Sequence, residues 1–327
     1  MKNKSIWIAS AFIVIAVILV SLIFFLKSPE KTDSKFSIRI PDTKFMGLLP
    51  LYIAEEKGFF NKNNIQIEWV DVKDPGQAEK SFLAGHADLN ITTFASSLQA
   101  EIRQPGTLSL FIPICETSDK PGSYLLVPKD SKITSTKQLK GKKIGTYSGP
   151  SQKAYAQIVL GKLGLKIDQD YEMIQVSSSS QIQALFGGTF DVLFTVEPYG
   201  SVAISQGAKV LENGVRTKYI NNPFWVGSFV VKKEFTLDKK KMNQFITAID
   251  EAIKYISENE TESRAILSSR TNIEKDVASI CYLYNWIIKP SDSNIDEMQD
   301  LIDLLISEKL LDKNVDISTI LYYNDEK

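Results

Sequence analysis

Two stretches decide the fold: FLAGHADLNITTF, residues 82–94, and LFGGTFDVLFTVE, residues 185–197. In each, a helix-like run closes on a glycine, an aspartate follows three residues later, and a strand-like run comes next. Gly85 thus matches Gly188, and Asp88 matches Asp191. Glycine-closed helices before strands are common in any α/β fold. The identical internal spacing nevertheless predicts two lobes of similar construction.

The rest of the chain from residue 36 alternates strand-like and helix-like segments. IQIEWVDV, LSLFIPI, KKIGTY, YEMIQVS and DVLFTVE are predicted strands, separated by short amphipathic runs. Such alternation is typical of an α/β protein whose mostly parallel sheets are covered by helices. After FWVGSFVVKKEF the pattern changes to long amphipathic helices, predicted over residues 238–269, 273–288 and 295–311.

Ligands of open α/β sheets bind outside the carboxyl ends of the strands. We therefore expect Thr92, Thr93 and Phe94 to face the stretch 195–197 across a cleft between the lobes.

The N-terminus carries an uncharged apolar run over residues 6–26, about the length that crosses a bilayer as a helix. Lys2 and Lys4 precede it, which favours a cytoplasmic N-terminus and an exported body. A cleaved signal peptide has a shorter apolar core and a small-residue cleavage site. A lipoprotein needs a cysteine after the run, and the first cysteine is Cys115. We expect an uncleaved anchor, residues 1–26, and a polar linker, residues 27–35.

Composition argues against several classes of protein. The net charge of -1 gives no reason to expect nucleic acid as a partner. Cys115 and Cys281 lie far apart in sequence, and His86 is the one histidine. This pattern favours two free buried thiols over a disulfide framework. It predicts no metal site, cofactor or catalytic residue.

The order of five segments resembles one family. FMGLLPLYIAEEKGFF, IQIEWV, SFLAGHADLNITT, QLKGKKIGTYSGPSQKAY and ALFGGTFDVLFTVEPY together are similar to the nitrate, sulfonate, taurine and thiamine-precursor type of ABC substrate-binding proteins (SsuA/THI5-like, NMT1 type). The resemblance spans nearly all of the chain from residue 36. The apparent transmembrane anchor departs from the family's usual cleaved signal or lipid.

The resemblance implies a type II periplasmic-binding-protein fold, in which the chain crosses between lobes twice. Lobe 1 would comprise residues 36–125 and 225–327, and lobe 2 residues 126–224. It also implies a non-enzymatic, extracytoplasmic protein that captures a small solute and delivers it to an ABC permease with its ATPase subunits. The apolar N-terminal run would tether this protein to the membrane.

Candidate ligand-binding residues are those that offer polar or aromatic groups at loops near the expected cleft. Glycine lets backbone amides approach a ligand, serines at a helix start favour an anion, and a carboxylate holds an amine. Each type also has a structural explanation, such as a helix cap, a turn or hinge packing. The candidates are Phe45, Met46, Gly47, Thr92, Thr93, Phe94, Ser148, Gly149, Pro150, Ser151, Glu197, Tyr199, Phe224 and Trp225.

The charge of the solute stays open at this point. Serines and helix starts favour a sulfonate or nitrate, whereas Glu197 with nearby aromatic residues favours an amine-bearing heterocycle such as a thiamine-precursor pyrimidine. The candidate loops contain no arginine, which weakens the case for an anion. A membrane-tethered ligand sensor is the alternative function. A pyrimidine-phosphate synthase is a weaker alternative. That relative uses histidines and a cysteine-rich motif, whereas this chain has one histidine and no cysteine cluster.

Overall fold

The computed structural model describes residues 35–148 and 150–323, without the side chain of Pro150. The described residues from 37 onward belong to one compact unit. The expected anchor, nearly all of the linker, and Gly149 lie outside the described residues. Across the described part of the chain, we find no helix with the length and apolar character that crossing a membrane requires.

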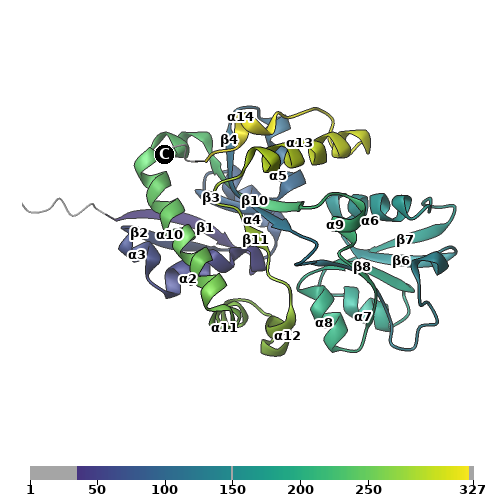
Figure 1. Ribbon diagram of the computed structural model, residues 1–327. Coiled ribbons are helices and arrows are strands. Elements are labelled where there is room, and N and C mark those ends of the chain that lie inside the picture. Colours follow the sequence, from purple (N-terminus) through teal and green to yellow (C-terminus); the bar gives the residue numbers. More distant parts are fainter. Residues whose placement is uncertain (1–34, 149, 324–327) are drawn as a thin grey trace, which may run out of the picture. The chain divides into compact units, whose positions relative to one another are not determined.

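The elements follow the predicted alternation (Figure 1). The first group is β1 (Phe36–Asp42), α2 (Leu49–Glu56), α3 (Phe59–Lys62), β2 (Ile65–Asp71), α4 (Pro75–Leu83), β3 (Leu89–Thr93), α5 (Phe94–Arg103) and β4 (Leu108–Glu116). The second group is β5 (Ser123–Val127), β6 (Lys142–Tyr147), α6 (Pro150–Lys162), β7 (Tyr171–Val176), α7 (Gln181–Phe186), β8 (Val192–Val196), α8 (Tyr199–Ser205), β9 (Lys209–Asn213) and α9 (Val215–Tyr219). The third group is β10 (Phe224–Lys232), α10 (Lys239–Glu258), α11 (Glu260–Arg270), α12 (Lys275–Ile280), β11 (Asn285–Trp286), α13 (Asp292–Ser307) and α14 (Ile317–Ile320).

The strands form two main sheets. One has the order β11-β4-β10-β3, the other β7-β6-β8-β5-β9, and β1 pairs with β2 beside them. The expectation of mostly parallel sheets is wrong, because the pairs of β10 with β3 and β4, and of β5 with β8 and β9, are antiparallel. The pairs of β6 with β7 and β8 are parallel. The strands that follow each passage between sheets, β5 and β10, run against their neighbours.

The chain passes from one sheet to the other between β4 and β5 and returns between α9 and β10. The boundary expected after Leu125 falls inside β5, which belongs to the five-stranded sheet. We therefore propose that the first lobe boundary lies before Ser123. The second proposed boundary, between Phe224 and Trp225, falls at the start of β10, and we move it to the residue before Phe224.

The repeat found in the sequence has a structural counterpart in two matching sets of hydrogen bonds. The Asp88 amide donates to the Arg39 carbonyl, and the Arg39 amide donates to the Asp88 carboxylate at 2.9 Å. Asp191 makes the same two bonds with Lys143. Gly85 and Gly188 both adopt the left-handed conformation, with φ of 79° and 73°, which glycine adopts without strain.

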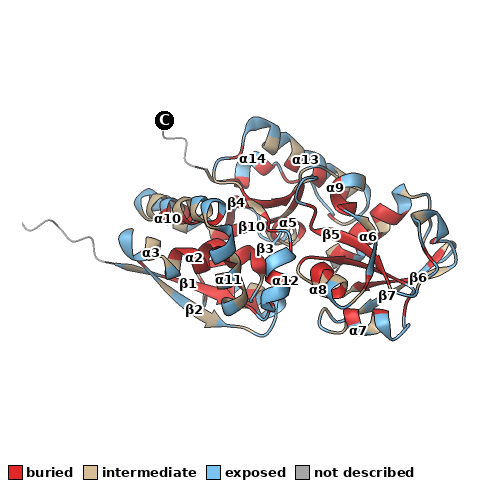
Figure 2. Cartoon of the chain, turned by 60° about the horizontal axis from the view of Figure 1, so that its bottom comes forward, coloured by how far each residue is buried: buried red, intermediate tan, exposed pale blue. Residues whose placement is uncertain are grey.

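One apolar cluster joins the two sheets. It includes Leu98, Leu110, Val127, Phe194 and Met298, so strands of both sheets and helix α13 contribute to it. The central strands β4, β5, β8 and β10 are largely buried while the helices expose their outer faces (Figure 2). The passage points are therefore packed into the core, and residues that follow the strand ends lie close together there.

The C-terminal helices differ from their predicted lengths. The helix expected over residues 238–269 is divided at Asn259 into α10 and α11. The helix expected over residues 273–288 is only α12, after which the chain is extended and forms β11. This extended stretch contributes to the site described next.

Candidate functional site

Glu197 directly follows β8 of the five-stranded sheet. At this point the chain contacts residues that belong to the side of the four-stranded sheet. The Glu197 carboxylate accepts hydrogen bonds from the Tyr124 hydroxyl at 2.7 Å and from the Ser201 hydroxyl at 2.8 Å. It also accepts one from the Tyr282 backbone amide at 3.1 Å. Glu197 is 1% exposed. A buried carboxylate therefore ties β5 and α8 to the extended stretch after α12.

The extended stretch, residues 281–287, alternates its contacts as a strand does. Tyr282 bonds Glu197, the Tyr284 ring lies 5.8 Å from the Phe45 ring, and the Trp286 indole donates to the Gly47 carbonyl at 3.0 Å. Asn285, on the opposite side, donates to the Thr117 hydroxyl at 3.1 Å. The side chains of Tyr284 and Trp286 thus reach the loop after β1, whereas Tyr282 meets Glu197 through its backbone amide.

Further aromatic residues surround this point. The rings of Tyr147 and Tyr199 lie 6.4 Å apart. Burial raises the pKa of Tyr284, and the charges of Arg216, Glu116 and Glu197 also act on it. The buried Gln152 side chain hydrogen-bonds Tyr147, and the Gln152 Oε1 has no partner among the described residues. The region therefore offers rings together with oxygen acceptors.

A buried ion pair lies at the passages between the sheets. The Arg216 guanidinium contacts the Glu116 carboxylate, with Nε 2.9 Å from Oε2, and stacks 4.5 Å from the Phe224 ring centroid. Ser123 donates its hydroxyl to Glu116 and accepts the Arg216 amide at 3.0 Å. Burial opposes the charge of Arg216, but Glu116 raises its pKa overall. Arg216 thus uses two of its guanidinium nitrogens on Glu116.

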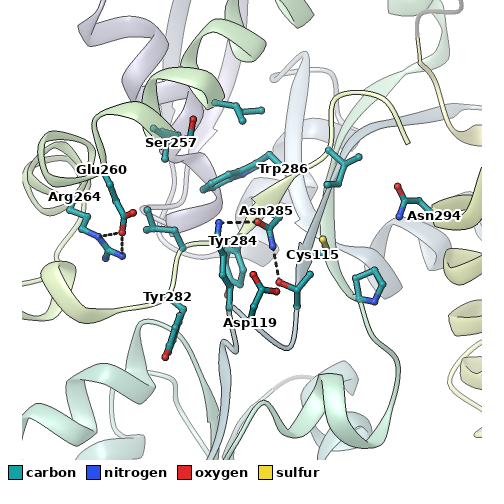
Figure 3. Close-up of a pocket in the computed structure, with 17 residues that line it drawn as sticks. Cys115, Asp119, Ser257, Glu260, Arg264, Tyr282, Tyr284, Asn285, Trp286 and Asn294 are labelled. Atoms are coloured by element: carbon teal, nitrogen blue, oxygen red, sulfur yellow. Dashed lines mark hydrogen bonds and ion pairs between the residues drawn. The ribbon is translucent and has the colours of Figure 1, made fainter. Parts of the chain in front are cut away.

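A cavity of about 760 Å³ opens beside the cluster (Figure 3). Trp286 and Tyr284 lie near its centre, with Glu260 and Arg264 of α11 on one side and Cys115 on the other. Arg264 is held by Glu260 and donates to the Ala278 and Cys281 carbonyls. The cavity shares Tyr282 and Tyr284 with the Glu197 cluster, so we treat both as one candidate site. We name the residues around Glu197 the acceptor cluster: Tyr124, Tyr147, Gln152, Glu197, Tyr199, Ser201, Tyr282 and Tyr284.

The structure brings some predicted residues together and places others elsewhere. Phe45, Glu197 and Tyr199 contact the acceptor cluster or belong to it, and Gly47 contacts Trp286, which lines the cavity. Met46 is 1% exposed and part of the core.

The threonines predicted to face the cleft make other contacts. Thr92 lines a small hollow with residues of α4 and α5. Thr93 caps α5, accepting the Ser96 amide at 3.2 Å. Phe94 is fully buried. Both threonines lie in β3, which matches the structural explanation that threonine favours strands.

The candidate residues of the serine loop, residues 148–151, and of the return passage into β10 are mostly engaged in contacts within the protein. The Ser148 amide and hydroxyl both donate to the Val176 carbonyl, at 2.7 and 3.1 Å. Ser151 is half-buried, while Gly149 and the side chain of Pro150 lie outside the described residues. Phe224 and Trp225 are fully buried, and Phe224 packs edge-on against Tyr155. A stacking role for these two rings therefore needs an opening of this region.

Sequence reasoning missed much of the acceptor cluster. Tyr282, Tyr284 and Trp286 alternate in CYLYNWI, a period-two pattern typical of a strand, within a stretch predicted as a helix. Tyr147 directly precedes the serine loop, and it too was overlooked. No local signal pointed to Gln152 or to the pair of Arg216 with Glu116.

Comparison with known proteins places the chain in a family. The model of the family described as NMT1/THI5 like matches residues 46–263. The chain belongs to this family. A "Putative thiamine biosynthesis protein" of Haemophilus influenzae is 25% identical over 226 residues, which cover 68% of this chain and 69% of that protein. A 4-amino-5-hydroxymethyl-2-methylpyrimidine phosphate synthase of Uromyces fabae is 27% identical over 49% of this chain, but over only 46% of its own length.

A solved structure agrees on the fold. The alkanesulfonate-binding protein SsuA from Xanthomonas axonopodis pv. citri, bound to MOPS, superimposes with a TM-score of 0.71 at 20% identity. The match covers 90% of this chain and 100% of that one. The NMT1/THI5-like chain thus has the α/β fold of periplasmic solute-binding proteins.

The two cysteines agree with the expected buried thiols. Cys115 and Cys281 are both free and buried. Burial raises the pKa of Cys115 to about 12 and that of Cys281 to about 11. Since the thiolate is the reactive form, both thiols are poor nucleophiles at neutral pH.

Burial of Glu197 leads to a prediction about pH. Burial raises its pKa above 4.5, although hydrogen bonds from Tyr124, Ser201 and Tyr282 oppose this. A carboxyl with a raised pKa stabilises the fold below its unfolded pKa, and this stability is lost as pH rises through the folded pKa. We expect the free energy of unfolding of the wild type, minus that of Glu197→Gln, to fall as pH rises above 4.5. Urea unfolding across this range measures it.

The exposed Glu172→Gln is the matched control, and its difference from the wild type should stay nearly constant across the same range. A difference for Glu197→Gln that is flat, or that grows with pH, would show that the folded protein does not disfavour the charge on Glu197.

Proposed function

We propose that this protein is the extracytoplasmic solute-binding component of an ABC uptake transporter. The observation that carries the proposal is the acceptor cluster at the junction of the two sheets, in a fold shared with solute-binding proteins. Glu197 of the five-stranded side and Tyr282 of the other side meet there. A solute that bridges such groups favours the closed arrangement of the lobes.

The chemistry of the cluster supports an amine-bearing aromatic solute over an anion. The Gln152 Oε1 is an acceptor without a partner among the described residues, and the Glu197 carboxylate would exchange bonds from Tyr124, Ser201 or Tyr282 for bonds from the solute. Both suit ring N–H or amino groups. Phe45, Tyr199 and Tyr284 offer rings for stacking, whereas the buried Arg216 is paired with Glu116. The names of relatives point to the same class, since two of them concern thiamine biosynthesis and an aminopyrimidine phosphate. We therefore assign thiamine-precursor pyrimidines as the preferred solutes, with sulfonates, taurine and nitrate as the alternative class.

The protein's place in the cell follows from the same proposal. The apolar run over residues 6–26 anchors the chain with its body outside the cytoplasm. The closed, loaded form then docks on a permease whose ATPase subunits drive uptake. No chemical step on the solute is part of this function, and the two buried thiols with raised pKa agree with that. The ligand-binding residues we assign are Phe45, Gly47, Tyr147, Gln152, Glu197, Tyr199, Tyr282 and Tyr284.

A thermal-shift panel on the full chain in mild detergent tests the proposal. A ligand that binds only the folded state at about 100 times its dissociation constant adds about 2.7 kcal/mol to the free energy of unfolding. We expect aminopyrimidines to raise the melting temperature by about 5 °C, and taurine, nitrate and amino acids to leave it unchanged. A shift with sulfonates alone would overturn the solute class. Conversion of the aminopyrimidine to a product would overturn the non-enzymatic assignment.

A further inference from the structure

A lysine-rich surface with exposed leucines lies at the end of the four-stranded sheet far from the candidate site. Two segments form it: residues 83–88, from the last residue of α4 to the residue before β3, and residues 232–241, from the last residue of β10 into the first turn of α10. They meet around a hollow of about 460 Å³ lined by Gly85, Asp88, Lys232 and Phe235. The Lys232 ammonium reaches the Leu83 carbonyl at 3.4 Å. We name these two segments together the lysine patch.

The patch combines exposed apolar side chains with positive charge. Leu237 is 79% exposed and Leu83 is 40% exposed, and Leu237 is the most exposed large hydrophobic residue described. The patch has five lysines, Lys232, Lys233, Lys239, Lys240 and Lys241, against three acidic residues. Two of those acids are paired, Asp88 with Arg39 and Asp238 with Lys241. Glu234, the third, is exposed. Exposed leucines combined with several lysines are typical of a surface that rests on an anionic bilayer.

The position of the patch in the fold agrees with such a partner. β10 runs from Phe224, beside Glu116 at the passage between sheets, to Lys232 in the patch. Eight residue steps along a strand separate the two ends by roughly 26 Å. A bilayer in contact with the patch therefore leaves the candidate site uncovered.

The entry of the chain into the body lies at the same end. Arg39 of β1 pairs with Asp88 of the patch. The apolar run ends at residue 26, and the nine residues before β1 reach at most about 30 Å when extended. An anchored chain therefore holds the patch within reach of the membrane surface.

We propose that the lysine patch docks on anionic lipid headgroups with Leu83 and Leu237 in the interface, holding the tethered body with its solute site turned toward solvent. The negative surface supplies the charge complement to the lysines, and each lysine near it adds to the attraction. This inference rests on the membrane anchor in the proposed function. It does not depend on the solute class.

The test places a thiol reporter in the patch of the full chain. His86→Cys is exposed, whereas the native Cys115 and Cys281 are 2% and 0% exposed. The chain is reconstituted in vesicles of phosphatidylcholine alone, or with about 30% phosphatidylglycerol. A water-soluble maleimide then labels the outward-facing fraction. We expect labelling to slow by roughly tenfold in the anionic vesicles, and the effect to vanish at about 1 M salt.

Two triple variants separate the patch from general electrostatics. Lys232→Gln with Lys233→Gln and Lys239→Gln should bring the ratio of the two labelling rates back to about one. Replacing the exposed Lys129, Lys132 and Lys137, on the connection between β5 and β6, should leave the slowing intact. Using the ratio within each variant cancels any change in the intrinsic reactivity of the thiol.

Equal labelling rates in the two vesicle types would overturn the proposal, as would a control triple variant that also abolishes the slowing. Failure of the chain to float with neutral vesicles overturns the anchor instead. If the wild type then still binds anionic vesicles and the triple variant of Lys232, Lys233 and Lys239 does not, the docking of the lysine patch is supported without the anchor. The two failures are therefore distinguishable.

Discussion

Arg216→Met is expected to lower the free energy of unfolding by about 3–5 kcal/mol. The side chains of Arg216 and Glu116 are only 2% and 0% exposed, so removing the guanidinium leaves a buried carboxylate without its countercharge. The loss is large because burial in a low-dielectric core makes an uncompensated charge costly. Chemical denaturation of the wild type and the variant measures it.

Two further variants make this prediction specific to the buried pair. Adding Glu116→Gln removes the orphaned charge while keeping an acceptor for Ser123, so the double variant should regain a substantial part of the lost stability. Lys218→Met removes a partner of Glu212 from a solvent-exposed pair and should cost little. If Arg216→Met proves as mild as Lys218→Met, the pair does not hold the passages between the sheets together.

Gly227→Ala is expected to destabilise the protein by about 3 kcal/mol. A Cβ at Gly227 would lie 2.3 Å from the Thr92 carbonyl oxygen, which is backbone of the neighbouring strand and cannot rotate away. The register of β10 against β4 shifts on both sides of this residue, so β10 is irregular here. The four-stranded sheet must therefore distort to accept even a methyl group.

Gly161→Ala in α6 is the matched control, because a Cβ there meets nothing within 4 Å. Gly161 lies in the last turn of α6, where alanine is favoured over glycine by at most about 1 kcal/mol, so this variant should be unchanged or slightly stabilised. Thermal unfolding of both variants compares them. Equal melting temperatures would show that β3 and β10 are not packed as closely as described.

Much of the fold was predictable because local chemistry specifies it. Gly85 and Gly188 close helices in the left-handed conformation, and the aspartates that follow bond the backbone of a neighbouring strand, so the repeat was visible in sequence. The directions of β5 and β10 could not be predicted. No local sequence signal distinguishes an antiparallel strand from a parallel one after the chain passes between the sheets. The long-range pairing of strands decides that.

The candidate site was only partly predictable for a related reason. Glu197 was found because it follows a strand end, where ligands of α/β sheets bind. Tyr282 and Tyr284 lie 85 and 87 residues further along the chain and reach Glu197 only through folding. The tertiary contacts of residues 281–287 override the helical pattern that the sequence suggests for that stretch. Thr92 lines a hollow with residues of α4 and α5, and Thr93 caps a helix, and neither placement could be read from the local sequence.

The most direct test of the central claim is the dissociation constant of an aminopyrimidine, measured by isothermal titration with the wild type, Glu197→Gln and Thr92→Val. Losing a charge-assisted hydrogen bond costs roughly tenfold or more in affinity. We therefore predict tight binding by the wild type and by Thr92→Val, with at least tenfold weaker binding by Glu197→Gln. Equal affinity of all three proteins would contradict a solute site at Glu197 between the two sheets.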